Sequence, residues 1–297
     1  MTVETAPAEL ATAQPAIGRR RARQRGVAWL LVPLVAIGAV GFAAPLLPLS
    51  DPNDQDLLAT FLPPVGFGGE WAHPLGTDQL GRDMLSRMVY GARLSYEIAI
   101  ASVLVAGLIG ASLGVAAGYL RGWVDVGVTR LIDAQLALPF LLLAIAIIAT
   151  RGQSLPVLIG VLAISGWAQY ARVLRADTLG LRERPFITGL RATGMSTPRI
   201  MMFHLMPNLA PTLVVIATLE VGTMIIGEGA LSFLGLGVTP PNVSWGLMLA
   251  EGRNYLQQAW WLVVFPGVAI GVVVLLANLG GDALRSRYDP RKTTRGS

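Results

Sequence analysis

Few residues of this chain could carry out catalytic chemistry. It has two histidines, His73 and His204, which stand far apart, and it has no cysteine. A histidine-based zinc site or a Ser-His-Asp triad therefore has no support in the sequence. The one lysine, Lys292, stands in the tail, so no glycine-rich loop carries the lysine that a P-loop uses to hold phosphate. We expect no enzyme activity, no metal and no cofactor in this chain.

Taken alone, His73, Asp78 and Asp83 could suggest a metal site. They stand in a turn-rich loop, however, and no second histidine is nearby. We therefore favour a turn followed by an amphipathic segment at the membrane interface, from Met84 to Tyr90.

Acidic side chains inside apolar runs point toward transport. Glu220 lies in the run 209–226, and Asp133 lies near the start of the run 131–150. A centred acid costs about 2.5–3.5 kcal/mol of insertion free energy, whereas each Leu, Ile or Val returns about 0.3–0.6 kcal/mol. The run around Glu220 is close to break-even in lipid, so we expect it to pack inside a bundle. Glu220 then faces either a structural polar partner or a watery pathway, and the sequence leaves both open.

The segment that follows this run, residues 228–241, is apolar but too irregular to continue as a helix. Irregular backbone at membrane depth must be buried in protein or line a cavity. We expect residues 231–241, called here the outer loop, to cover the outer mouth of a pathway, either as a gate or as a plain structural turn. The candidate pathway or gate residues are Glu220, Glu228, Phe233 and Leu234.

A polar stretch between two apolar runs, residues 181–208, is called here the knuckle. Pro185 suits a first helical position, and Gly194 suits a helix end, where φ > 0 is cheap for glycine. Pro198 suits the first turn of a second short helix, which Pro207 is expected to stop. The knuckle also holds four arginines: Arg182, Arg184, Arg191 and Arg199. From the residues alone, an ordinary basic loop is an equally good interpretation.

The elements that position these residues are predicted to be membrane helices. The chain of 297 residues is 53% hydrophobic and 14% charged, well below the roughly 25% charged residues of soluble domains. Apolar runs of about 20 residues are long enough to cross a bilayer. We expect six spans, at residues 27–49, 98–120, 131–150, 155–174, 209–226 and 260–279. The glycines at 107, 110 and 114 predict a close approach of a neighbouring helix.

The placement of basic residues predicts the orientation. With the N-terminus in the cytoplasm, the inner segments hold eighteen Arg and Lys residues and the outer segments hold five. This topology places both termini and the knuckle in the cytoplasm. It also accounts for the net charge of +5 without nucleic acid, because no basic patch is interleaved with aromatic residues.

The knuckle resembles the EAA loop of ABC importer permeases, in which a glycine is followed downstream by a Leu-Pro-like pair. Gly194 and Met206-Pro207 stand at these positions, whereas Thr188-Gly189-Leu190 replaces Glu-Ala-Ala. Residues 73–83 resemble the stretch before the second helix of C-type dipeptide and oligopeptide permeases. Residues 228–246 and 281–291 are similar to the outer loop and the C-terminus of the same family.

The resemblance implies an all-α membrane protein with the type I ABC importer permease fold, in a prokaryotic inner membrane. It implies a second related permease, two ATPase subunits that bind ATP and Mg, and an extracytoplasmic substrate-binding protein. The knuckle would dock on an ATPase through six residues: Arg191, Ala192, Thr193, Gly194, Met195 and Ser196. Peptides are the expected substrate, and nickel, glutathione or another small solute is the alternative within the family.

The expected organisation follows from these assignments. Residues 1–26 form an Arg-rich cytoplasmic segment, and residues 27–93 form the first span with an outer loop. Residues 94–283 form the transmembrane core that contains the knuckle, and residues 284–297 form a cytoplasmic tail. An ion-coupled secondary transporter is the alternative from another class, since Glu220 and Asp133 could carry protons.

Overall fold

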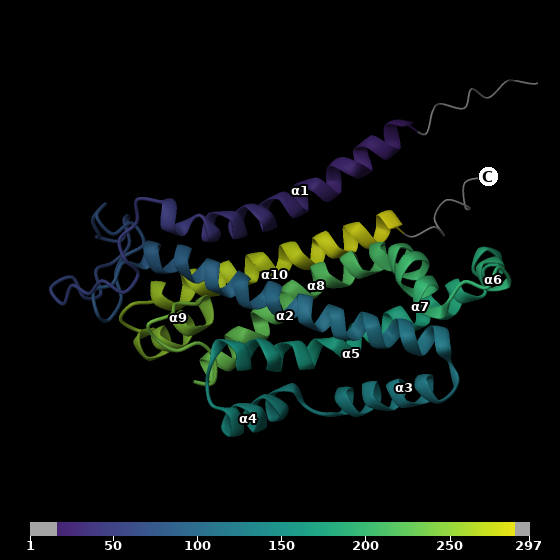
Figure 1. Cartoon of the computed structure of the whole chain (residues 1–297). Coiled ribbons are helices and arrows are strands. Elements are labelled where there is room, and N and C mark those ends of the chain that lie inside the picture. The colour runs from purple at the N-terminus through teal and green to yellow at the C-terminus, as the bar shows by residue number, and fades with distance from the viewer. Residues whose placement is uncertain (1–16, 289–297) are drawn as a thin grey trace, which may run out of the picture.

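The protein is a bundle of helices, described by a computed structural model over residues 17–288 (Figure 1). No β-strand forms within these residues. Residues 1–16 of the Arg-rich segment and 289–297 of the tail lie outside the described part of the chain. The α-helices are α1 (Ile17–Phe42), α2 (Met84–Leu120), α3 (Gly122–Ala137), α4 (Phe140–Arg151), α5 (Leu155–Arg182), α6 (Pro185–Ala192), α7 (Thr197–Ile200), α8 (Met206–Phe233), α9 (Trp245–Gly252) and α10 (Trp261–Tyr288). Three shorter turns are η1 (Ala44–Leu46), the π-helical η2 (Met201–Leu205) and η3 (Arg253–Tyr255).

Four stretches of helix are long and apolar enough to cross a membrane, namely α2, α5, the run Thr197–Phe233 and α10. The pair α3 and α4 adds a fifth crossing if the two helices form one broken span. The apolar part of α1, Trp29–Phe42, is shorter than these. The expected all-helical membrane fold is confirmed, whereas the count of six spans stays a prediction.

The span expected at residues 131–150 is not one straight helix, which corrects the sequence-based prediction. It is divided into α3 and α4, which meet at an angle of 92°. Pro139 explains the break, because a proline disfavours the helical conformation of the residue before it. Leu138 accordingly has the extended conformation, with φ −86° and ψ 126°.

The helices α2 and α5 pack along much of their length, at the glycines that the sequence singled out. A β-carbon at Gly110 would lie 2.4 Å from the Trp167 carbonyl oxygen, and one at Gly114 would lie 2.6 Å from that of Ala171. Real β-carbons do not approach so closely, so only glycine allows the two backbones to touch here. The predicted close approach is confirmed, and α5 is the partner helix.

The helix α8 is longer than expected at both ends. Pro207 does not stop the second helix of the knuckle, because it lies in the first turn of α8, directly after a π-helical turn. A π-helical turn, Met201–Leu205, joins α7 to α8 without a loop. At the other end the helix passes through Glu228 and finishes at Phe233, and Gly235 with φ +77° follows. The irregular segment therefore begins after Phe233 rather than at Glu228.

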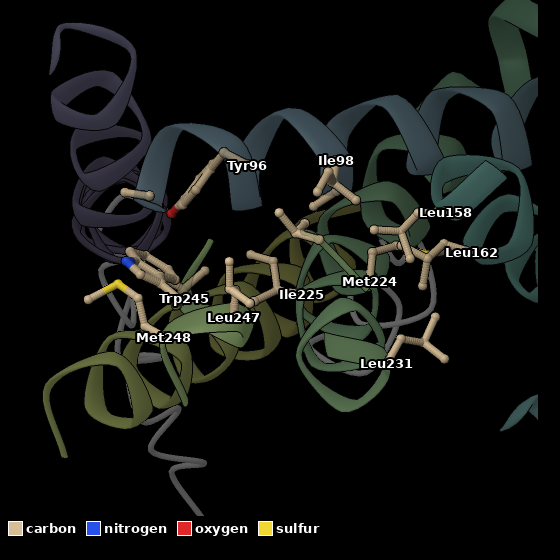
Figure 2. Packing of buried hydrophobic residues seen from close by; sticks show 14 of the residues in the cluster. Tyr96, Ile98, Leu158, Leu162, Met224, Ile225, Leu231, Trp245, Leu247 and Met248 are labelled. Carbon is tan, nitrogen blue, oxygen red and sulfur yellow. The ribbon is translucent and has the colours of Figure 1, made fainter. Parts of the chain in front are cut away.

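The two ends of the bundle differ in their covering elements. The knuckle helices α6 and α7 lie at the end where α1 begins and α10 finishes, while α9 and residues 43–83 lie at the opposite end (Figure 1). We call these the knuckle end and the outer end. The short helix α9 is held at the outer end by Trp245, whose Nε1 donates a hydrogen bond of 2.9 Å to the Met88 carbonyl oxygen. Figure 2 shows Trp245 beside Tyr96 of α2, with ring centroids 6.2 Å apart.

Candidate functional site

The knuckle has the helix–glycine–helix form that the sequence predicted. Pro185 occupies the first turn of α6, and Gly194 has φ +77° between α6 and α7. The Met195 amide donates to the Leu190 carbonyl oxygen at 3.2 Å, and this bond closes the end of α6 in the manner of a Schellman turn. Ile187 and Ile200 are fully buried beneath the turn, so the knuckle has its own apolar support.

The predicted ATPase-contacting residues do not all point the same way. Ala192, Thr193, Gly194 and Ser196 are exposed, and a β-carbon at Gly194 would meet no atom within 4 Å. Met195 is half-buried and packs on the apolar support of the knuckle. Arg191 is also half-buried, and its Nε donates a hydrogen bond of 3.1 Å to the Tyr119 hydroxyl at the end of α2. The exposed tip is therefore narrower than the predicted set of six residues.

Glu220 lies half-buried on α8 and faces α5. A β-carbon at Gly166 of α5 would lie 3.4 Å from Glu220 Oε2, so the carboxylate sits close to the α5 backbone. Glu220 makes no hydrogen bond or ion pair with any residue of the range 17–288. The nearby Tyr170 hydroxyl is buried and likewise has no hydrogen-bond partner in that range. The sequence predicted this packing inside the bundle, and whether Glu220 meets a pathway stays a prediction.

Glu228 is completely buried near the end of α8. Its Oε1 accepts hydrogen bonds from Ser232 Oγ at 2.6 Å and from Ser244 Oγ at 2.8 Å. Gly246 of α9 lies directly against the carboxylate, since a β-carbon there would be 3.0 Å from both oxygens. Glu228 thus holds the start of α9 against α8. Its place on a pathway stays a prediction.

Phe233 and Leu234 lie in the first half of the outer loop and are 44% and 52% exposed. The Arg253 guanidinium lies 5.0 Å from the Phe233 ring centroid and donates a hydrogen bond of 2.8 Å to the Phe233 carbonyl oxygen. The side-chain amide of Gln153 donates to the Gly235 carbonyl oxygen. Leu231 and Val238 are buried, so the outer loop is anchored at both sides while its tip stays open.

An open apolar groove of about 800 Å³ runs beside α2, between α5 and the junction of α7, η2 and α8. Leu104 and Leu108 of α2 form one wall, and Met202 and Val214 form the other. All four side chains are at least half exposed in the single chain. Within a membrane such a surface faces lipid or another helical subunit.

The sequence did not predict a buried charge cluster that lies at the outer end. Asp78 Oδ2 lies 2.6 Å from Arg82 Nε and 2.8 Å from Arg87 Nη1. Glu251 Oε2 lies 3.1 Å from Arg82 Nη2 and 2.6 Å from Arg87 Nη2. Arg82 and Arg87 are almost fully buried, so each charge is compensated away from water. Glu251 follows Arg82 by 169 residues and Arg87 by 164 residues in sequence, and no local spacing could reveal the cluster.

The contacts of residues 73–90 correct the predicted interfacial segment and account for the loop before it. Asp83 caps α2 by accepting a hydrogen bond of 2.8 Å from the Ser86 amide, and His73 Nδ1 lies 3.0 Å from Asp83 Oδ1. No group of three potential metal ligands forms within residues 17–288. The segment expected to lie on the membrane interface, Met84 to Tyr90, is instead the start of α2, and Met84, Ser86 and Arg87 are buried in protein.

Comparison with known proteins gives a consistent result. A family model described as "Binding-protein-dependent transport system inner membrane component" matches residues 110–294. A di/tripeptide transport system permease protein of Pseudomonas aeruginosa is 41% identical over 91% of this chain and 89% of its own length. A dipeptide transport system permease protein of Alkalihalophilus pseudofirmus is 43% identical over 74% of this chain and 72% of its own length. A solved chain of the MetNI methionine ABC transporter in inward-facing conformations has a TM-score of 0.55 at 20% identity, and it covers 69% of this chain and 98% of that chain.

The charge cluster should stabilise the outer end strongly. Asp78→Asn leaves Arg82 and Arg87 short of a negative charge in a buried site, so the free energy of unfolding should fall by about 3–5 kcal/mol. The control is Glu97→Gln, which breaks the exposed pair of Arg93 Nε and Glu97 Oε1 at 2.8 Å. This variant should lose less than about 1 kcal/mol. Thermal denaturation in detergent measures both, and equal melting temperatures would contradict a stabilising role for the cluster.

Proposed function

The chain belongs to the family of binding-protein-dependent transport system inner membrane components, and we propose that it is the membrane-spanning permease subunit of an ATP-driven importer of di- or oligopeptides. The observation that carries the proposal is the knuckle: a protruding helix–glycine–helix turn at one end of a membrane bundle, in a chain that matches peptide permeases over most of its length. Such a turn offers an exposed tip to a soluble partner.

Energy must come from outside this chain, because its single lysine, Lys292, belongs to no glycine-rich phosphate loop. Two ATPase subunits would bind ATP and Mg at the knuckle end, and a second related permease would complete the pathway. A substrate-binding protein would deliver peptide to the outer end. The placement of arginine supports this orientation, with the knuckle and both termini in the cytoplasm of a prokaryote.

The geometry supports a direct mechanical route from the knuckle to the pathway. The helix α7 continues through the π-helical turn into α8, so a displacement of α7 acts on α8 without an intervening loop. Glu220, Glu228 and Phe233 all lie on α8. Closure of the ATPases would tilt α8, move Glu220 against α5 and shift the start of the outer loop. Phe233 and Leu234 would then open or close the outer mouth.

One observation favours a second candidate, an ion-coupled transporter. Glu220 has no hydrogen-bond or ion-pair partner within residues 17–288 and lies close to the unpaired Tyr170 hydroxyl. Intramembrane acids of this kind carry protons in transporters driven by gradients. The source of energy therefore separates the two candidates.

The proposed function predicts ATP-dependent uptake by the reconstituted complex. Vesicles that contain this chain, the second permease and both ATPases should take up a labelled peptide when ATP and the binding protein are supplied. Uptake should stop without ATP and should persist when an uncoupler dissipates the proton gradient. Uptake that needs the gradient and ignores ATP would support the ion-coupled candidate instead.

Gly194 should be required for coupling rather than for folding. Its φ of +77° suits glycine and tolerates asparagine, but a β-branched residue fits it poorly. Gly194→Val should keep the complex assembled while ATP hydrolysis no longer drives uptake, and Gly194→Asn should retain most of the uptake. The ratio of peptide transported to ATP hydrolysed in vesicles is the measurement. Coupled uptake by Gly194→Val at the normal ratio would show that the turn does not transmit motion.

Glu220 could meet the charged N-terminus of a peptide in the pathway. The unpaired carboxylate faces α5 in an otherwise apolar region, where a cationic group would be its natural partner. A structural role, in which Glu220 bonds to a helix of the second permease, explains the same geometry.

A conservative substitution separates these two roles of Glu220. Glu220→Gln keeps the side-chain shape and removes the charge. If Glu220 binds the peptide amine, the variant should reduce uptake of peptides with a free N-terminus several-fold more than uptake of N-acetylated peptides. Competition uptake with matched peptide pairs measures this difference. Equal losses for both, or no loss, would assign Glu220 to structure.

A further inference from the structure

Two arginines of the knuckle share one aromatic ring. The Arg191 guanidinium carbon lies 4.7 Å from the ring centroid of Tyr119, and that of Arg182 lies 5.8 Å from the same centroid. Tyr119 belongs to the last turn of α2, Arg182 ends α5, and Arg191 lies in the last turn of α6. Three helices thus meet at one ring, and two positive charges are brought together there.

Neither arginine has an acidic partner in residues 17–288, although other arginines of the chain do have one. Arg121 pairs with Glu183, and Arg175 pairs with Asp125. By contrast, Arg182 Nε and Nη1 and Arg191 Nη2 are buried and have no hydrogen-bond acceptor. A buried donor without an acceptor is costly, and more so when it is charged. No acid of residues 17–288 therefore balances the charge of these two arginines.

The remaining guanidinium nitrogens show where an anion can enter. Arg182 Nη2 and Arg191 Nη1 are not among the buried unpaired atoms and make no hydrogen bond to the described chain, so they are open to the outside. A guanidinium presents paired N–H groups that match the two oxygens of a carboxylate. One carboxylate between these two nitrogens would pair with both guanidinium groups, balance one of the two positive charges and draw α5 and α6 together over Tyr119.

We propose that Tyr119, Arg182 and Arg191 form a socket for one carboxylate side chain of the partner ATPase. This proposal rests on the proposed function, which brings an ATPase to the knuckle. Figure 1 shows α6 projecting beyond the end of α2, at the end of the bundle where a soluble subunit would dock. The exposed residues Ala192, Thr193 and Gly194 follow Arg191 directly, and a protein that covers them would also reach the socket.

The socket would add a second route for motion. The knuckle already leads into α8 through α7, whereas the socket joins the ATPase to α2 through Tyr119 and to α5 through Arg182. Because α2 and α5 touch at Gly110 and Gly114, a pull on the carboxylate would move these two helices together. Tyr119 is a positioning residue in this scheme, and the two arginines bind the anion.

A crosslinking experiment tests the socket in the assembled complex, and the chain is well suited to it. Lys292→Arg removes the only lysine, and Arg182→Lys or Arg191→Lys then places a single side-chain amine in the socket. A water-soluble carbodiimide joins an amine to a carboxylate only when the two are in contact. Both variants should form a permease–ATPase product, and mass spectrometry should find the same ATPase Asp or Glu in each. The matched control is Arg130→Lys in the Lys292→Arg background, because Arg130 is exposed on α3.

The outcomes distinguish the socket from the proposed function as a whole. A benzophenone on a cysteine at Thr193, in this cysteine-free chain, reports whether the knuckle touches the ATPase at all. If Thr193 crosslinks but neither lysine variant does, the socket is wrong and the docking of the knuckle stands. If Thr193 also fails to crosslink, both are wrong.

Transport supplies a second, independent readout. Arg191→Gln should reduce ATP-driven uptake by roughly tenfold or more, as expected for the loss of a hydrogen bond between charged groups. Exchanging the charges, with Arg191→Glu in the permease and arginine at the identified ATPase acid, should restore uptake, which a purely structural arginine would not allow. If the effect of Arg191→Gln appears in vesicles with phosphatidylglycerol and vanishes in pure phosphatidylcholine, the anion is a lipid phosphate and the proposal is overturned.

Discussion

The contact between the backbones of α2 and α5 is the constraint on which the rest of the bundle depends. At Gly110 and Gly114 the two helices approach more closely than any side chain would permit. In a bilayer, where lipid tails are as apolar as leucine, such contact supplies much of the packing energy that holds helices together. The helix α8 then packs on this pair, α10 packs on α8, and α9 closes the outer end.

The buried polar groups at the two ends of the bundle differ in whether they find partners within the chain. At the outer end, Asp78 and Glu251 compensate Arg82 and Arg87 within the chain itself, and Glu228 Oε1 accepts hydrogen bonds from two serines. At the knuckle end, Arg182 and Arg191 keep donors without acceptors. The buried arginines of the outer end are therefore paired with acids of the same chain, whereas those of the knuckle end are not. Glu220 lies on α8 between the two ends, and it too has no hydrogen-bond or ion-pair partner within residues 17–288.

Sequence reasoning predicted the features that depend on local spacing and missed those that depend on distant contacts. Pro185 and Gly194 defined the knuckle correctly, because a proline and a glycine limit the backbone wherever they stand. Pro207 was misread as a stop, since a proline ends one helix or begins another according to what precedes it. The helix break at Pro139 was overlooked within an otherwise uniform apolar run. The charge cluster around Asp78 could not be predicted because Glu251 reaches it from a distant helix. The contacts of Arg182 and Arg191 with the Tyr119 ring could not be predicted for the same reason.

The bend between α3 and α4 has a consequence for biosynthesis. The chain emerges in order, so α3 and α4 reach the membrane before α5, while the glycine face of α2 is still unoccupied. A straight apolar helix at that moment could lie against this face and hold the place of α5. The 92° break at Leu138 shortens the straight stretch, so α4 does not continue along the line of α3. We therefore expect the break at Pro139 to leave the glycine face of α2 free for α5 during synthesis.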